Sequence, residues 1–451
     1  MDVSSDTLPE VKSIERETIR RVAWRLIPLL MLGYFCAFLD RSNIGMAAPT
    51  MLPALHFSNA VFGFGAGVFF LGYFLAEIPS NLILDRVGAR RWIARILITW
   101  GIISGLTAFV WNDWSFYGVR FLLGLVEAGF YPGVVLYMTW WFPSSYRTRM
   151  VALFQSAAVI SLIIGPPVGS LLLRLNGLFG LAGWQWLYIV EALPSIVMCF
   201  VIWHLLTDRP KDAVWLRPEQ RAWLVERIEA ERAEREAIRK FSLRDAFYNP
   251  KVWLISIAYV GTNGVSYGVA FFLPLIVKGL GTSSSMIGVV TAVPYFAALL
   301  AMNYWGWHSD KTGERKWHAA GACLLCAAGL AACTVIGAGH PVITMVALTF
   351  AIMGQQSVSG PFWALPCALL TGTAAAGGFA MINAIGGLGG WFCPWLVGVV
   401  KDATGSFNTA LFCLALAPAM SAMALLLAGH DRRMEQVPNA AVKRSSLQHS
   451  P

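Results

Sequence analysis

"DRVGARRW" at residues 85–92 recurs as "DKTGERKW" at residues 310–317. The second octet begins 225 positions after the first in a chain of 451 residues, and it keeps the acid, the glycine, the last two cations and the tryptophan in register. Each octet lies between two long apolar stretches, so it predicts a short polar turn between two helices. Its repetition after half the chain predicts two related halves in parallel orientation.

The composition is typical of a membrane protein. Apolar residues make up 57% and charged residues 13% of the chain, whereas ordinary globular domains carry about 25% charged residues. A bilayer-spanning helix needs about 20 apolar residues. Stretches of that length lie near Met31, Phe69, Ile102, Leu125, Val159, Ile196, Ile257, Tyr295, Leu325, Leu348, Gly389 and Leu416. We predict an all-α membrane protein with twelve transmembrane helices in two six-helix halves; a soluble protein is disfavoured because too few polar residues remain to cover it.

The basic residues predict the topology. Of the 34 lysines and arginines, only Arg174, Lys278 and Lys401 fall on one side of the predicted spans, and Arg41 and Arg120 lie within spans. All others fall on the opposite side, which the positive-inside rule assigns to the cytoplasm together with both termini. The net charge of +9 therefore reflects topology, and we expect no nucleic-acid partner. The polar N-terminal stretch lacks a cleavable signal, so the first span is expected to stay as an anchor.

The predicted organisation has five parts. A cytoplasmic tail (1–21) precedes an N-terminal six-helix bundle (22–206), and a cytoplasmic linker (207–251) leads to a C-terminal six-helix bundle (252–430) and a second cytoplasmic tail (431–451). The linker contains "PEQRAWLVERIEAERAEREAIRK", in which Glu and Arg alternate as in a solvated helix with salt bridges. We expect it to act as a connector, with Trp215, Trp223 and Leu224 resting on the membrane surface.

The two octets suggest a conformational latch. Gly88 and Gly313 permit the chain reversal, and Asp85 and Asp310 can pair with a helix terminus or a neighbouring arginine. Such pairs could exchange partners as the halves rock, although simple anchoring of the turns inside the cell is an alternative. The residues assigned to the latch are Asp85, Arg86, Gly88, Arg91, Asp310 and Gly313.

Ionisable side chains inside the spans are the strongest functional signal. Each costs about 2.5 to 3.5 kcal/mol to insert, so such residues usually serve a function. They are Asp40, Arg41, Glu77, Arg120, Glu127 and Glu191. All lie in the first half, and Glu77 and Glu191 receive no assigned role. The second half offers neutral polar groups instead, among them Tyr267, Gln355 and Asn383.

The first and fourth spans are expected to form one polar pocket. Arg120 and Glu127 are seven residues apart, which places them on one helix face about 10 Å apart. An arginine there suits capture of a carboxylate. Burial disfavours the charge of Glu127 and a nearby arginine favours it, so its protonation should depend on whether an anion occupies the arginine. The alternative is a permanent structural ion pair between helices.

The membrane potential favours coupling to protons. Moving a monoanion into a cell at about −100 mV costs about 2.3 kcal/mol, one proton cancels that cost, and a second makes entry favourable. Asp40 and Glu127 would supply two proton sites, and protons are the only cofactor expected. No histidine lies in the middle of a span, so the relay should use carboxylates.

Other motifs argue against an enzyme. Cys323 and Cys326 have no histidine or acid nearby, which argues against a metal site. "GGLGG" at residues 386–390 lacks the Lys-Ser/Thr ending of a phosphate loop and is better explained by helix contact or a hinge. No catalytic triad is visible. "GPPVGS" at residues 165–170 resembles the glycine-proline element of drug:proton antiporters, and a kinked packing face explains it equally.

Several stretches resemble a known family. "DRVGARRW" is similar to the signature loop of the major facilitator superfamily. "FLDRSN", "GYFLAEIPSNLILDRVGARRW" and "RFLLGLVEAGFYPG" resemble the anion:cation symporter family within it, particularly the bacterial branch of tartrate, phthalate and hydroxyphenylacetate permeases. The first loop departs in having Asn81 where a glycine is usual. Phe38 stands where sugar-acid members have a tyrosine, which argues against a polyhydroxylated substrate.

This resemblance implies roles for particular residues. Asp40 and Glu127 would be the protonatable groups and Arg41 and Arg120 the anion contacts, while Tyr73 and Asn383 match pocket positions. The aromatic residues Phe38, Phe271, Trp363 and Tyr267 would suit an apolar or aromatic acid, although such residues often serve packing.

The expected function follows from these assignments. We expect a monomer in a bacterial inner membrane that imports a small organic carboxylate with protons by alternating access. An anion exchanger, a drug or organic-compound:proton antiporter and a carboxylate sensor are the alternatives.

Overall fold

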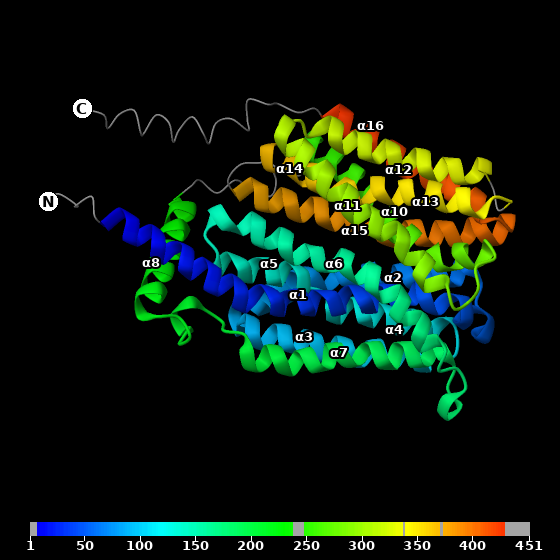
Figure 1. Ribbon diagram of the computed structural model, residues 1–451, viewed down its shortest axis with the longest axis horizontal. Coiled ribbons are helices and arrows are strands. Elements are labelled where there is room, and N and C mark those ends of the chain that lie inside the picture. Colours follow the sequence, from blue (N-terminus) through cyan, green and yellow to red (C-terminus); the bar gives the residue numbers. More distant parts are fainter. Residues whose placement is uncertain (1–6, 238–247, 337–338, 370–372, 429–451) are drawn as a thin grey trace. The chain divides into compact units, whose positions relative to one another are not determined.

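The computed structural model describes residues 7–237, 248–336, 339–369 and 373–428, and these ranges contain helices, turns and loops (Figure 1). The predicted tail at 431–451 and residues 238–247 of the predicted linker lie outside the described residues. The helices of the first half and its linker are α1 (Thr7–Leu55), α2 (Asn59–Val87), α3 (Ala89–Leu106), α4 (Asp113–Glu127), α5 (Phe130–Trp141), α6 (Ser144–Leu173), α7 (Gly183–Leu205) and α8 (Pro218–Ala237). Those of the second half are α10 (Pro250–Gly279), α11 (Ile287–Thr312), α12 (Lys316–Ile336), α13 (Pro341–Ser357), α14 (Ser359–Leu369), α15 (Thr373–Thr404) and α16 (Phe407–Ala428).

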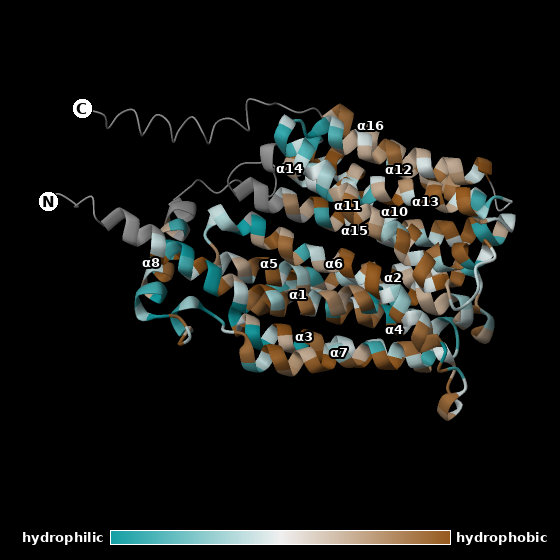
Figure 2. Ribbon diagram, in the orientation of Figure 1, coloured by the Kyte–Doolittle hydropathy of each residue, from teal (hydrophilic) through white to brown (hydrophobic). Residues whose placement is uncertain are grey.

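Twelve of the described helical segments are long and apolar enough to cross a membrane, as predicted. Figure 2 shows their predominantly apolar residues and the polar residues gathered on α8. The chain forms two compact units, one of Met1–Ala237 with Thr282–Ala292 and one of Ile238–Gly281 with Val293–Pro451.

Two spans are broken in the middle, which the sequence analysis did not predict. The fourth span consists of α4 and α5, and the tenth consists of α13 and α14. Each break lies four residues before a proline, Pro132 after Ala128 and Pro361 after Ser357. Because proline has no N–H, it cannot donate the helical hydrogen bond to that carbonyl. Gly129 completes the first break in the left-handed region at φ 89°. The breaks therefore occupy corresponding positions in the two halves.

Close approach of α2 and α4 positions the first-half site. A Cβ on Gly124 would lie 2.0 Å from the Phe69 carbonyl oxygen, and one on Gly72 would lie 2.3 Å from that of Phe121. Only glycine permits such contact between two helix backbones. The contact brings Phe69 and Tyr73 of α2 beside the face of α4 that carries Arg120.

The corresponding contact in the second half involves the "GGLGG" stretch of α15. A Cβ on Gly389 would lie 2.0 Å from the Val260 carbonyl oxygen of α10. Asn263 of α10 also donates to the Gly386 carbonyl oxygen at 3.0 Å. The interpretation of this stretch as a helix contact is therefore confirmed.

The first octet forms the turn between α2 and α3. Gly88 has φ 98°, a conformation that favours glycine. Asp208, which follows the sixth span, accepts from the Arg90 backbone N–H at 2.8 Å and so stabilises the start of α3. Asp85 lies 3.6 Å from Arg209. Asp85 therefore pairs with an arginine, whereas the acid at the helix terminus is Asp208, which was not singled out from the sequence. Arg86 and Arg91 are exposed.

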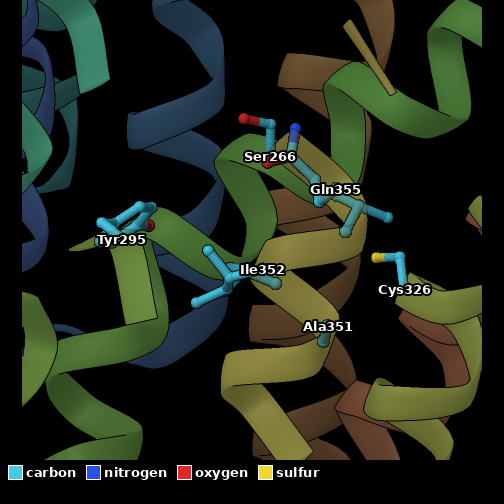
Figure 3. A pocket seen from close by; sticks show the side chains of 8 residues that line it. Ser266, Tyr295, Cys326, Ala351, Ile352 and Gln355 are labelled. Atoms are coloured by element: carbon cyan, nitrogen blue, oxygen red, sulfur yellow. The ribbon is translucent and has the colours of Figure 1, made fainter. Parts of the chain in front are cut away.

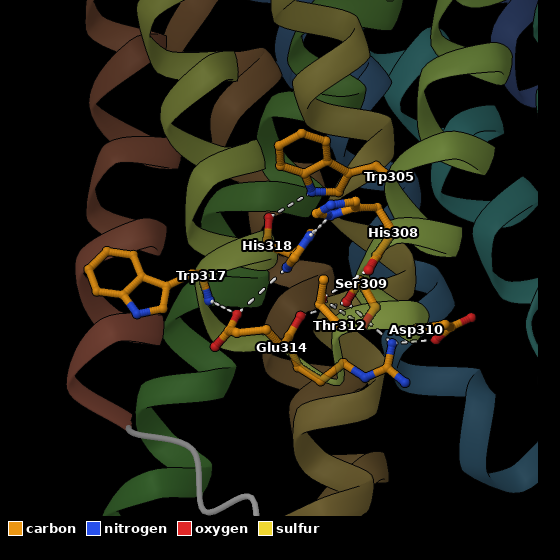
Figure 4. Close-up of polar contacts among 9 residues, drawn as sticks. Trp305, His308, Ser309, Asp310, Thr312, Glu314, Trp317 and His318 are labelled. Atoms are coloured by element: carbon orange, nitrogen blue, oxygen red, sulfur yellow. Dashed lines mark hydrogen bonds and ion pairs between the residues drawn. The ribbon is translucent and has the colours of Figure 1, made fainter.

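The second octet forms the turn between α11 and α12 and closes mainly on itself (Figure 4). Gly313 has φ 64°. Asp310 forms an ion pair with Arg315 of the same turn. Glu314 accepts from the Trp317 backbone N–H at 2.8 Å, and the rings of His308 and His318 share a hydrogen bond of 2.7 Å. The two octets therefore share their reversal but use different partners.

The linker helix α8 packs against the first unit, which corrects the expectation of a helix on the membrane surface. Leu224 is fully buried, and the Trp215 ring stacks on Trp141 with centroids 5.6 Å apart. Glu231 accepts from the backbone N–H of Ser144 at 3.1 Å, at the start of α6. Figure 1 shows α8 beside the first turns of α1, where Arg217 forms an ion pair with α1. Leu224 and Trp215 therefore pack on other residues of the first unit.

Candidate functional site

Asp40 is held by three neutral donors on two neighbouring helices. Its Oδ2 accepts from Trp100 Nε1 at 2.8 Å and from Ser195 Oγ at 2.9 Å, and its Oδ1 accepts from Ser104 Oγ at 2.9 Å. Trp100 and Ser104 lie on α3 and Ser195 on α7. The Asp40 side chain is 1% exposed. Because these three partners are neutral, Asp40 can gain a proton without breaking an ion pair with any of them.

Arg41, the next residue, is directed to α4 and forms an ion pair with Glu127. Its guanidinium carbon lies 5.0 Å from the Phe38 ring centroid and 5.8 Å from that of Tyr73. The Arg41 side chain keeps 11% of its surface exposed, whereas that of Glu127 keeps 1%. The first and fourth spans thus meet in one polar site, with Arg41 in the position facing Glu127.

Arg120 is fully buried, and none of its three guanidinium nitrogens has a hydrogen-bond partner among the described residues. Its guanidinium carbon lies 5.3 Å from the Phe69 ring centroid, and that of Arg41 lies 5.1 Å from the same centroid. The two cations are therefore held beside one aromatic ring. Glu127 lies within electrostatic reach of Arg120, but its ion pair is with Arg41 rather than with the arginine of its own helix.

Glu127 is the last residue of α4, directly before the break in the fourth span. A negative charge at a helix C-terminus is opposed by the helix dipole, so Glu127 depends on Arg41 or on a proton. Gly129, two residues later, packs so closely on Ser80 of α2 that a Cβ would lie 2.2 Å from its Oγ. The break therefore fixes the end of α4 against α2.

The predicted residues of the second unit are spread over three helices. Tyr267 of α10 packs on Phe271 with ring centroids 5.6 Å apart. Trp363 of α14 lies edge to face with Tyr259, with centroids 5.0 Å apart. Asn383 of α15 is half-buried. The two aromatic residues therefore have packing partners within their own unit.

A small pocket lies elsewhere in the second unit (Figure 3). Its lining includes Ser266, Tyr295, Cys326, Ala351, Ile352 and Gln355. Gln355 lies two residues before the end of α13, so the pocket adjoins the break in the tenth span. Tyr267, Trp363 and Asn383 do not line it. In the sequence, Gln355 is recognisable only as a polar residue within a span.

Sequence reasoning missed the donors around Asp40 and the neighbours of Arg120. In the sequence, these donors are ordinary residues of apolar spans, namely Trp100, Ser104 and Ser195. Only the spacing of Trp100 and Ser104, about one helix turn, indicates a shared helix face. Tyr188 of α7 is 1% exposed and lies within electrostatic reach of Arg120. For the site as a whole, no group of three or more metal-ligating side chains occurs in the part of the chain that the structure describes.

Comparisons with known proteins agree with this architecture. Residues 30–394 match the model of the Major Facilitator Superfamily. A protein of Agrobacterium vitis named as a tartrate transporter is 46% identical over 436 residues, covering 97% of this chain and 95% of that protein. NicT of Pseudomonas putida, named as a metabolite transport protein, is 40% identical over 399 residues, covering 88% and 90%.

A solved structure supports the fold. The crystal structure of a D-xylose–proton symporter superposes with a TM-score of 0.70 at 15% identity, covering 90% of this chain and 97% of that one. At that identity it shows the fold alone. The twelve spans, the family match and the bacterial relatives together describe a multi-pass bacterial membrane protein that transports a small molecule and is not an enzyme. The chain belongs to the major facilitator superfamily, in the branch of anion:cation symporters that its sequence resembles.

Proposed function

We propose that this secondary transporter imports a small organic carboxylate together with protons by alternating access. The observation that supports this most directly is the ion pair of Arg41 with Glu127 beside Arg120, a buried cation without a hydrogen-bond partner among the described residues. A guanidinium offers five donors in a fixed fork that suits a carboxylate. The relative named as a tartrate transporter supports an organic acid as the substrate class.

Exchange of partners at Arg41 would couple the anion to a proton. Arg41 is the more exposed of the two arginines, so an entering carboxylate meets it first and competes with Glu127. A released Glu127 would be a buried carboxylate at a helix C-terminus, which favours binding of a proton. Rearrangement of α1 and α4 would then expose Arg120 to the same anion. Asp40 would provide the second proton site.

The contacts of the first site suggest an acid with an apolar part. Phe38, Phe69 and Tyr73 surround the Arg41 guanidinium, with ring centroids 5.0 to 5.8 Å away. A carboxylate bound to Arg41 would therefore lie against aromatic surface. In the second half, the proposed substrate contacts are Tyr267, Trp363 and Asn383. Asn383 is proposed from the family resemblance, and the two aromatic residues from their residue types.

The duplicated turns are proposed to act as a conformational latch. Asp85 pairs with Arg209 beyond the sixth span, and Asp310 pairs with Arg315 in its own turn. Asp85 is 62% exposed, so its pair is weak enough to break during each cycle. We also propose a monomer with both termini in the cytoplasm of the cell.

Uptake into proteoliposomes tests the proposed function. Purified protein should accumulate a radiolabelled carboxylate, chosen by thermal-shift screening of a carboxylate panel, when an inward proton gradient is imposed. Arg120→Ala should reduce uptake at least about 100-fold, since losing a charge-assisted contact costs about 3 kcal/mol. Arg174→Ala, outside the spans, is the control and should transport normally. Full uptake by Arg120→Ala would contradict the proposal.

Preloading distinguishes the alternative functions. A symporter fills empty vesicles, whereas an anion exchanger requires substrate inside. A drug:proton antiporter would expel a labelled amphiphile as protons enter. The glycines of "GPPVGS" in α6 give the antiporter little support, because Gly165 and Gly169 pack against Leu39 and Met46 of α1.

A further inference from the structure

We propose that Glu191, a buried acid to which no role was assigned, forms a carboxyl pair with Asp40 that shares one proton, and that this pair sets the pH range of transport. The inference rests on the proposed function, since it concerns the proton supply of the same site.

One stripe of α7 faces one stripe of α1. Tyr188, Glu191 and Ser195 are three and four residues apart, so they lie on one face of α7. Ser195 bonds directly to Asp40 of α1. Asn43, one turn further along α1, lies against Glu191. The two helices therefore run antiparallel with Asp40 opposite Ser195 and Asn43 opposite Glu191.

Glu191 is almost completely covered in this position. Its exposed fraction is 3%, and those of Asn43 and Tyr188 are 2% and 1%. No ion pair to Glu191 occurs within the described ranges, and the charged group that acts on it is Asp40. Two buried carboxyl groups without a cation between them cannot both ionise at low cost. One proton held between them removes the repulsion.

The helices packed around the pair supply neutral donors from α3 and two charged groups from α4, because Arg120 and Glu127 both lie within electrostatic reach of Asp40. From α3 the pair meets Trp100 and Ser104. α6 carries no ionisable side chain between Arg149 and Arg174. Arg120 of α4 lies within electrostatic reach of Asp40 and of Tyr188. Tyr188 is the ionisable neighbour of Glu191 on α7. Arg120 is thus a cation within electrostatic reach of the pair, and it is also the proposed anion contact.

Charge counting gives the pair its function. The spanning helices of the first unit bury the three acids Asp40, Glu127 and Glu191 and hold two cations that face them, Arg41 and Arg120. Fully ionised, the set carries one net negative charge, which a low-dielectric interior disfavours. One resting proton makes it neutral. A bound monoanion restores the net negative charge, so the set then takes up a further proton. The carboxyl pair holds the proton that is present before the anion binds.

The pH profile of proton-driven uptake tests the pair. In Glu191→Gln the like charge beside Asp40 is absent, so Asp40 loses its proton at lower pH. The alkaline limb of the profile should therefore shift by about one pH unit to lower pH. Ser195→Ala removes a donor to the Asp40 carboxylate and should shift the limb to higher pH. Glu219→Gln, an exposed acid of α8, is the matched control and should leave it unchanged.

An infrared titration gives a second readout that does not require transport. The C=O stretch of protonated carboxyls should persist to higher pH in the wild type than in Asp40→Asn, because only the wild type retains the pair. An unshifted limb in Glu191→Gln, or equal titration of that band in wild type and Asp40→Asn, would overturn the inference. If the wild type shows no proton-driven uptake, the proposed function fails, and the infrared titration still decides whether the pair exists.

Discussion

At the scale of single residues, Asp40 and Arg41 show how two neighbours on one helix serve different contacts. Successive residues on a helix are rotated by about 100°. Asp40 therefore reaches Trp100 and Ser195 on α3 and α7, while Arg41 reaches Glu127 on α4. Asp40 and Glu127 are therefore expected to respond differently to a bound anion. An anion that binds Arg41 removes the ion-pair partner of Glu127, whereas Asp40 keeps its neutral donors.

Glu127→Gln should separate exchange from accumulation. The amide keeps the size of the side chain and can still contact Arg41, but it takes up no proton. We expect the variant to bind substrate and to exchange it at a rate within about 10-fold of the wild type, since the lost interaction costs about 1 kcal/mol. Proton-driven accumulation should fall to background.

Counterflow and gradient-driven uptake of one radiolabelled acid measure the two activities side by side. Arg174→Ala again serves as the control. Accumulation at the wild-type level in Glu127→Gln would assign the coupling to Asp40 instead.

At the scale of helices, the site depends on two features of the fourth span. Glycine contacts hold α4 against α2, and the break before Pro132 ends α4 at Glu127. Short or interrupted spans at corresponding positions of two halves are typical of transporter binding sites. The second half has the same feature, because the tenth span is also interrupted, close to Gln355.

Gly124→Ala should destabilise the protein, and Gly118→Ala should not. A Cβ on Gly124 would lie 2.0 Å from the Phe69 carbonyl oxygen, and backbone cannot yield as a flexible side chain would. We expect a loss of about 1 to 3 kcal/mol. A Cβ on Gly118, on the same helix, would meet nothing within 4 Å, so alanine there should be neutral or gain up to about 1 kcal/mol.

Thermal unfolding of both variants in one detergent measures the difference. Equal melting temperatures would show that α2 and α4 do not approach as closely as described. Because the contact also carries Tyr73 toward Arg41, we expect the Gly124 variant to lose substrate-induced stabilisation as well.

At the scale of the whole molecule, the distribution of lysine and arginine predicts the topology. The charges of the octets and of α8 are predicted to lie on one side, and Arg174 near the loop on the other. Their bias orients the spans during insertion. The linker segment before α8 lies on the same side as the first octet, since Arg209 pairs with Asp85.

Reporter fusions test this orientation. A fluorescent protein fused after residue 451 should fluoresce, as expected for a cytoplasmic C-terminus. Alkaline phosphatase inserted after Gly177, where a Cβ would meet nothing within 4 Å, should be active, because that loop is predicted to face the periplasm. Insertion after Val214, which is 87% exposed, should give an inactive enzyme. The reverse pattern would contradict the predicted topology.

The sequence by itself determined the class of fold and the set of candidate residues. Span length and hydropathy are local properties, so twelve helices and the duplicated turns with Gly88 and Gly313 could be predicted. The cost of burying charge likewise singled out Asp40, Arg41, Arg120 and Glu127.

Only the tertiary structure decided which of these residues meet. Helical spacing put Arg120 and Glu127 on one face, but the ion-pair partner of Glu127 is Arg41 of α1, and α4 ends at Glu127. The donors to Asp40 come from α3 and α7. Their approach depends on helix packing across many residues, which no local pattern contains.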